Sequence, residues 1–228
     1  MGTRATYGLR KYGKDKLTYN HFDGYPTGLG DAIVKQIMEM GIDRLNRLFD
    51  NLEMVEEGVN DTNYTRLREI QGDLLGHERV GQMIDNNDFI NDSLFCEWGY
   101  IVNLDTLMLE VYKGFQRKKH KKGRYATDKP AYIPNYDPSV KYFPCALVLE
   151  IPLLELDTCI MGELEELVEI SDNITLDITK FKFHGKSAHG GKKPKTKAKP
   201  KPQVKIGSAS IRLDTFIKTI DREERLLK

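Results

Sequence analysis

Polar residues suited to acid–base chemistry gather near the N-terminus of this 228-residue chain. Asn20, His21 and Asp23 stand close together, and Gly28 and Gly30 follow them. A carboxylate beside an imidazole can orient it for proton transfer, and a nearby amide can hold a ligand or an oxyanion. A helix that starts after the glycines would direct its first amides at an anion. Alternatively, Asn20 and Asp23 only satisfy turn backbone, and His21 is a partly buried polar residue.

The flanking segments predict how these residues are positioned. Apolar residues alternate over 6–9 and again over 16–23, with a polar turn at Gly13 between them, which indicates a β-hairpin. If the second strand stays regular that far, His21 and Asp23 share one face. From Leu29 to Met40 apolar residues recur at helical spacing, and Gly41 suits the end of that helix.

The rest of the chain indicates a mixture of helices and strands. Apolar spacing predicts helices over 42–52, 64–74, 80–84 and 162–170, and strands over 95–102, 106–115, 141–152 and 175–183. The fold class is therefore α+β, with a layered antiparallel sheet and packed helices.

The composition divides the chain into three parts. Residues 1–184 carry the pattern of one main α+β domain. Residues 185–203 are rich in Lys, Pro and Gly and hold no large apolar residue, which predicts a disordered linker or a surface loop. Residues 204–228 recover apolar residues and predict a last strand and a short helix that return to the main domain.

Composition also excludes several classes of protein. The sequence shows neither an apolar run long enough to span a membrane nor a signal-peptide core, so we expect a cytoplasmic protein without membrane partners. The three cysteines are widely spaced and form no CxxC pair, and HExxH is absent. We expect reduced cysteines and neither a metal nor a cofactor.

Two basic segments are candidate nucleic-acid contacts. Lysines neutralise phosphates whatever the base sequence, and nearby aromatic rings can stack on bases. Alternatively, the two segments are only a solubilising loop and a linker. A third interpretation is that they dock onto an acidic protein or onto the chain's own acidic helix. The candidate contacts are Arg117, Lys118, Lys119, Lys121, Lys122, Lys193 and Lys195.

The N-terminal motif resembles a family of uncharacterised proteins from bacteriophages and bacteria. The segments MGTRATYGLR and TYNHFDGYPTGLG are similar to that family's TRG-YG-R opening and YNHFDSYP-GLG segment, and they depart from it at Ala5 and Gly24. The resemblance covers about the first 30 residues, with weaker similarity near 100–105 and 109–112. It implies a phage-type origin rather than a particular reaction.

The layout of hairpin, helix pair and later hairpins is also similar to that of N-terminal-nucleophile (Ntn) hydrolases. Such enzymes expose Cys, Ser or Thr as their first residue, and the free α-amine acts as base. This likeness implies Thr3 as a nucleophile after cleavage behind Gly2, with Arg4 and Asn20 nearby.

Three functions follow as hypotheses. The first is a binding or sequestration protein in the host cytoplasm that counters host defence. Its small polar ligand or host protein would contact Arg4, Asn20, His21, Asp23, Gly28 and Gly30. The second is an amidohydrolase that uses Thr3, and the third is a nucleic-acid-binding protein that uses the basic segments.

Overall fold

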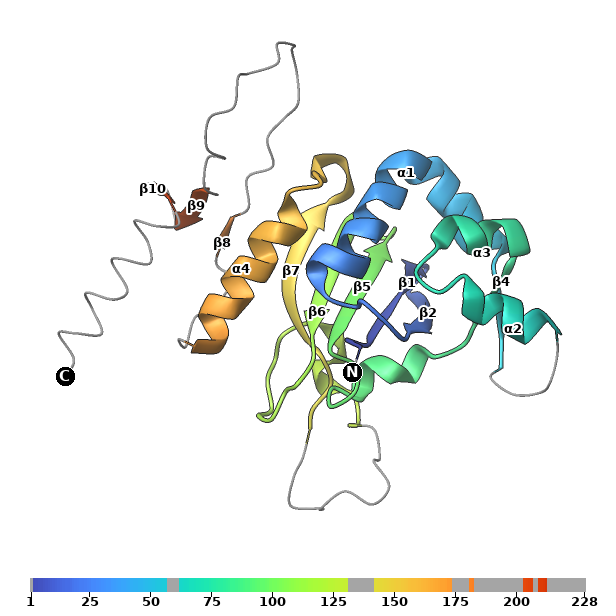
Figure 1. Ribbon diagram of the computed structural model, residues 1–228, viewed down its shortest axis with the longest axis horizontal. Helices are drawn as coiled ribbons and strands as arrows, with labels where there is room; N and C mark the ends of the chain where they lie inside the picture. Colours follow the sequence, from blue (N-terminus) through green and yellow to red (C-terminus); the bar gives the residue numbers. More distant parts are fainter. Residues whose placement is uncertain are drawn as a thin grey trace, which may run out of the picture. The chain divides into compact units, whose positions relative to one another are not determined.

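The computed structural model describes residues 2–56, 62–130, 142–173, 181–182, 203–206 and 209–212. The chain divides into two compact units, Met1–Leu156 and Asp157–Lys228, and each is described by itself (Figure 1). The expected linker at 185–203 lies outside the described residues apart from Gln203. The domain boundary expected after residue 184 therefore stays a prediction.

A five-stranded sheet organises the first unit. Its strands, in spatial order, are β2 (Lys14–Asn20), β1 (Ala5–Lys11), β5 (Trp98–Asn103), β6 (Met108–Lys113) and β7 (Ala146–Pro152). Neighbouring strands are antiparallel except β1 and β5, which are parallel. The predicted α+β class is confirmed, and the predicted antiparallel sheet is mostly so, because the β1–β5 pair is parallel.

The predicted N-terminal hairpin is confirmed as β1 and β2. Two residues connect the strands, Tyr12 with φ 55° and Gly13 with φ 69°. Positive φ at both positions matches the turn whose twist suits a two-residue hairpin. The carboxylate of Asp105 accepts the Tyr12 N–H at 2.7 Å and the Gly13 N–H at 2.9 Å, so the turn is fixed to the β5–β6 connection.

Helices cover one face of this sheet. Figure 1 shows α1 (Asp31–Asn51) and α3 (Leu74–Val80) over the β1–β2–β5 region, with α2 (Thr62–Glu69) beside α3. The Tyr7 hydroxyl lies 2.8 Å from His77 Nε2, and Lys16 Nζ donates to the Phe49 carbonyl at 2.7 Å. Gly41, at φ 68°, breaks α1 where the sequence predicted a helix end.

The short helix predicted over 80–84 is wrong. Gly81 adopts the left-handed conformation, φ 76°, and ends α3 there. The next residues form strand β4 (Gln82–Ile84), which pairs in parallel with β3 (Glu53–Val55). Val80, Met83 and Ile84 have helical spacing, but the pairing with β3 decides the structure of this segment.

The other face of the sheet carries a core that two short 3₁₀ helices cover, η2 (Asn87–Asn91) and η3 (Arg124–Thr127). Its buried members are Leu17, Ile90, Cys96, Ile101, Tyr112, Tyr125 and Cys145. A polar network borders this core. The Arg124 guanidinium bonds the Glu110 carboxylate, the Tyr112 hydroxyl at 3.1 Å, the Tyr125 hydroxyl at 2.9 Å and Asp15 at 3.3 Å. Burial raises the pKa of Tyr112 and of Tyr125 well above the ordinary value.

Two remaining short helices belong to the first unit, the π-helical turn η1 (Pro26–Gly30) and the 3₁₀ helix η4 (Leu153–Glu155). In the second unit, α4 (Ile160–Asn173) is the predicted acidic helix. A small antiparallel sheet has the order β10 (Ala209–Arg212), β9 (Gln203–Ile206), β8 (Phe181–Lys182). The segment from 204 thus contributes two short strands, and the expected final helix lies outside the described residues. None of the helices in the described ranges is long and apolar enough to cross a membrane.

Candidate functional site

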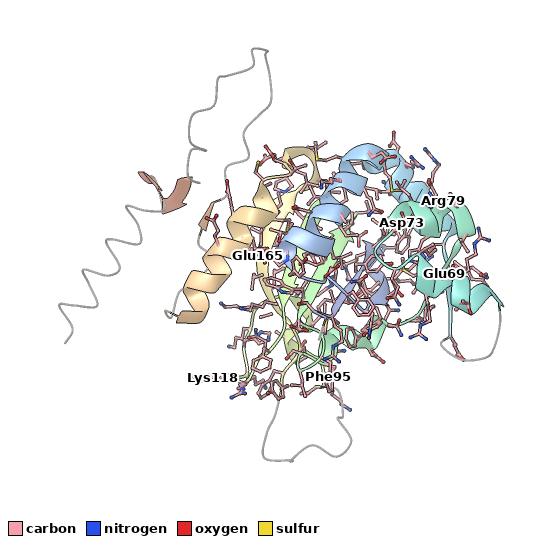
Figure 2. The ribbon with its side chains drawn as sticks, viewed as in Figure 1. Glu69, Asp73, Arg79, Phe95, Lys118 and Glu165 are labelled. Carbon is pink, nitrogen blue, oxygen red and sulfur yellow. The ribbon has the colours of Figure 1, made fainter. Side chains whose placement is uncertain are left out.

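A pocket of about 650 Å³ opens where β2 ends and α1 begins. Three segments form its wall: the chain after β2, the turn into α1, and the end of α2 with the residues behind it. Glu69, labelled in Figure 2, belongs to the third segment. The lining residues are Asn20, His21, Phe22, Asp23, Tyr25, Gly28, Leu29, Ala32, Arg68, Glu69, Gln71 and Gly72.

Local hydrogen bonds shape the chain as it leaves β2. The Asn20 side-chain amide donates to the Phe22 carbonyl, and Asp23 takes φ 51°, a conformation that Asp tolerates better than most residues. The Gly24 N–H donates to the Thr3 carbonyl at 2.9 Å, which ties this loop to the chain before β1. The loop is thus a defined wall of the pocket.

The structure places His21 and Asp23 in the same pocket but not in a hydrogen-bonded pair. Because β2 ends at Asn20, strand alternation does not extend to them. His21 Nδ1 lies 2.6 Å from the Tyr19 hydroxyl, and the His21 N–H donates to Gln71 Oε1 at 3.1 Å. Among the described residues, the bonding partners of His21 are therefore Tyr19 and Gln71.

The backbone amides of the glycine turn point to the chain's own carbonyls. Gly28 N donates to Tyr25 O at 3.0 Å, Leu29 N to Asp23 O at 2.8 Å, and Gly30 N to Tyr25 O at 3.4 Å. A Cβ on Gly28 would lie 2.3 Å from the Asp23 carbonyl oxygen, so only glycine fits there. Gly28 lines the pocket, whereas Gly30 is buried and is not among the lining residues.

Exposed rings and charges give the pocket its chemistry. Phe22 is 64% exposed, and its ring packs edge-on against the His21 imidazole at 4.2 Å between centroids. The charged lining side chains are the carboxylates of Asp23 and Glu69 and the guanidinium of Arg68. The pocket therefore combines aromatic surface with two carboxylates and one guanidinium.

The segment 68–72 is the part of the site that the sequence did not indicate. Two hydrogen bonds join this segment to the rest of the site. Gln71 Oε1 accepts the His21 N–H, and Gln36 Nε2 on α1 donates to the Gly72 carbonyl at 2.9 Å. Gly72 takes φ 81°, and a Cβ there would lie 3.1 Å from Leu29 Cδ1. The signal available in the sequence was Gln71-Gly72 behind a helical pattern, which is typical of any helix end.

Thr3 and Arg4 lie beside the pocket rather than in its wall. Thr3 contributes its carbonyl to the bond with Gly24. Arg4 has a different environment, in which its guanidinium lies 4.7 Å from the centroid of the Phe95 ring. The Arg4 N–H donates to Glu97 Oε1 at 3.1 Å.

The first basic segment forms a separate exposed surface between β6 and η3. It presents Arg117, Lys118, Lys119, Lys121 and Lys122, all exposed. Lys193 and Lys195 lie outside the described residues. In the described part of the chain, no group of three His, Cys, Asp or Glu side chains is placed to hold a metal ion.

Comparisons with protein-family models, curated proteins and solved structures find no match to this chain.

Proposed function

We propose that this protein binds a small polar molecule with a flat ring in the β2–α1 pocket and acts by sequestering it. The observation that carries this proposal is the pocket itself, formed where Asn20, His21 and Asp23 gather. Its volume of about 650 Å³ falls within the usual range for small-molecule sites. Hydrogen bonds from the turn and from α1 hold its wall, so the site is formed before a ligand arrives.

The lining favours a nucleoside-like ligand. Phe22 offers an exposed ring on which a flat heterocycle can stack. Asp23 and Glu69 can accept N–H and O–H groups from a base or a sugar. Two carboxylates against one guanidinium, and glycine amides that already donate within the chain, argue against a ligand rich in phosphate.

Binding without turnover fits the positions of the candidate catalytic groups. His21 is engaged with Tyr19 and Gln71 instead of Asp23, and Thr3 stands outside the lining. The same proposal includes a layered fold similar to that of Ntn hydrolases, in a protein that has this architecture but does not catalyse hydrolysis. The resemblance of the N-terminal motif supports a phage-type protein in the host cytoplasm, where capture of a host molecule would counter a defence that needs it.

Calorimetric titration of the full chain with adenosine, guanosine, cytidine and uridine tests the proposal, with the 5′-monophosphates as a second set. We expect saturable binding of at least one nucleoside and weaker binding of its monophosphate. Phe22→Ala should weaken binding about tenfold through the lost stacking. Asp23→Asn should weaken it without disturbing the fold, because Asn also tolerates φ 51°.

Leu154→Ala is the matched control, since Leu154 is a large exposed side chain outside the lining. It should bind like the wild type. Two results would overturn the proposal: no binding of any nucleoside or nucleotide, or binding that Phe22→Ala leaves unchanged. Chromatography of the recovered nucleoside checks for turnover, and a new product would replace sequestration with catalysis.

A further inference from the structure

Phe115 is held in an unusual position just after β6. The residue is 53% exposed, and its backbone takes φ 60°, a conformation that is strained for an aromatic residue. Strain of this kind persists only where the surrounding structure enforces it, and it gathers at functional sites. Phe115 therefore presents its ring to solvent against both its backbone preference and its hydrophobicity.

The backbone around Phe115 is fixed on both sides. Gly114 N donates to Glu97 O at 2.8 Å, and Phe115 N donates to Ser93 O at 2.5 Å. Gln116 N donates to Ser93 Oγ at 3.1 Å, and Ser93 is fully buried. A Cβ on Gly114 would lie 1.9 Å from the Cys96 carbonyl oxygen, so this close approach requires glycine. The exposed ring thus stands on a rigid support.

Aromatic and cationic groups surround the ring. The Tyr142 ring, which is buried, meets Phe115 edge to face at 5.3 Å between centroids. The Arg117 guanidinium lies 5.1 Å from the Phe115 centroid and 5.9 Å from that of Tyr142. Planar groups of these two kinds are the ones on which unpaired bases stack.

A basic segment leads away from the ring. The residues from Val111 to Thr127 include no Asp or Glu, and those from 117 to 122 include five exposed cations. The segment is anchored to the chain that enters β7. Phe143 N donates to Gln116 O at 2.8 Å, His120 Nε2 lies 2.7 Å from Pro144 O, and Leu147 N donates to Lys122 O at 3.2 Å. The anchoring holds the backbone while the side chains of Lys118, Lys119 and Lys121 project from it.

More cation–aromatic contacts occur at this end of the sheet. Lys113 Nζ lies 5.8 Å from the Trp98 ring, and the Arg4 guanidinium lies over Phe95. Figure 2 shows Lys118 and Phe95 at the same end of the sheet. In sequence, Phe95 lies between Ser93 and Glu97. The Ser93 carbonyl accepts the Phe115 N–H, and the Glu97 carbonyl accepts the Gly114 N–H. We name the exposed Phe115 ring and the exposed cations that follow it the Phe115 platform, and define it as Phe115, Arg117, Lys118, Lys119, Lys121 and Lys122.

We propose that the Phe115 platform binds single-stranded nucleic acid, with a base stacked on Phe115 and the phosphate backbone along residues 117–122. An exposed ring serves an unpaired base, whose face is open, and a base inside a duplex offers no such face. The platform carries no helix or β-ribbon of the kind that enters a major groove. An acidic protein would use the lysines but has no need of a solvent-exposed ring on a strained backbone.

Fluorescence anisotropy with labelled oligo(dT) and oligo(U) of about 20 nucleotides, titrated with the full chain, tests the platform. We expect binding that weakens as salt is added. A plot of the logarithm of the binding constant against the logarithm of the salt concentration should have a slope of about −0.7 for each phosphate neutralised. A DNA duplex of equal length should bind more weakly. Comparison of the two oligonucleotides shows whether DNA or RNA is preferred.

Phe115→Asn removes the ring but keeps a residue that accepts φ 60°, so it should fold at least as well as the wild type. It should weaken binding about tenfold or more, with little change in the salt slope. The matched control is Tyr12→Asn, because Tyr12 is also an exposed ring, 72% exposed, at φ 55° but at the tip of the β1–β2 hairpin. The double variant Lys118→Gln/Lys119→Gln should weaken binding and flatten the salt slope.

The proposal would be overturned by no binding at low salt, by equal affinity of Phe115→Asn and wild type, by duplex binding as tight as single-strand binding, or by full competition from poly-glutamate at equal charge. The last two would identify a duplex-binding or a general polyanion surface instead. A loss of binding in Tyr12→Asn equal to that in Phe115→Asn would also contradict it, because the ring at the platform would then have no special role.

Discussion

Replacing Arg124 with methionine should destabilise the first unit by about 3 kcal/mol. Its guanidinium joins two carboxylates on different strands, Asp15 on β2 and Glu110 on β6. The Glu110 side chain is only 5% exposed, and it also accepts bonds from Asn103 at 2.6 Å and Tyr112 at 2.9 Å. Without Arg124, Glu110 would be a buried carboxylate with no cation beside it.

The expected magnitude follows from this burial. Removing one partner of a buried ion pair costs about 3–5 kcal/mol, because the other charge stays desolvated. The lower value applies here, since the Arg124 side chain keeps 23% exposure and water can reach the gap. Methionine keeps an apolar stem near Tyr125, whose ring centroid lies 4.6 Å from the guanidinium, so lost packing adds little.

Urea unfolding followed by the fluorescence of Trp98, the chain's single tryptophan, measures this loss. Arg79→Met is the control, because Arg79 pairs with Asp73 at an exposed position on α3, labelled in Figure 2, and should cost less than about 1 kcal/mol. The double variant with Glu110→Gln should lose less than the sum of the single losses, since it leaves no lone buried charge. A loss under about 1 kcal/mol for Arg124→Met, or strict additivity, would mean that Glu110 does not depend on Arg124 for its charge compensation.

Three further predictions concern other parts of the chain. Burial lowers the pKa of His77, so the folded state favours the neutral imidazole. The stability that this gives is full above the ordinary His pKa of about 6.5 and is lost as pH falls through the lowered folded pKa. Urea midpoints measured across pH should show this loss, and His77→Asn should make the pH dependence smaller. Gly8→Ala places a Cβ 2.0 Å from the Lys16 carbonyl oxygen and should lower the free energy of unfolding by about 2 kcal/mol or more in the urea assay. Gly162→Ala is its control: a Cβ there meets nothing within 4 Å, so the variant should be neutral or stabilising. Intact mass spectrometry should find Gly2 still attached to Thr3. A chain that begins at Thr3 would favour the amidohydrolase.

The elements predicted well from sequence are those whose signals are local. Alternation on both sides of Gly13 identifies the hairpin, and Gly41 marks the break in α1. The wrong helix over 80–84 shows the limit of such signals. Val80, Met83 and Ile84 repeat at helical spacing, but the partner that makes 82–84 a strand lies near residue 54. Periodicity within a segment carries no information about that partner.

The candidate site was predictable to the same extent. Asn20, His21 and Asp23 are close in sequence and line one pocket. Their hydrogen bonding was not foreseeable, because Gln71 reaches His21 from 50 positions along the chain. Phe115 is a similar case, since its left-handed backbone depends on Ser93, which only the folded sheet brings next to it.

The parallel pairing of β1 with β5 has a consequence for how the protein is made. The pairing of β1 with β2 is local in sequence and can form early. Strand β5 begins only at Trp98, so one edge of β1 stays unpaired while the intervening residues leave the ribosome. Such an edge is a template for wrong strand pairing until its partner arrives. The rate of native sheet assembly is therefore set by this long-range step and not by the hairpin. Fragments that stop before residue 98 should consequently aggregate, whereas chains that include β5 should not.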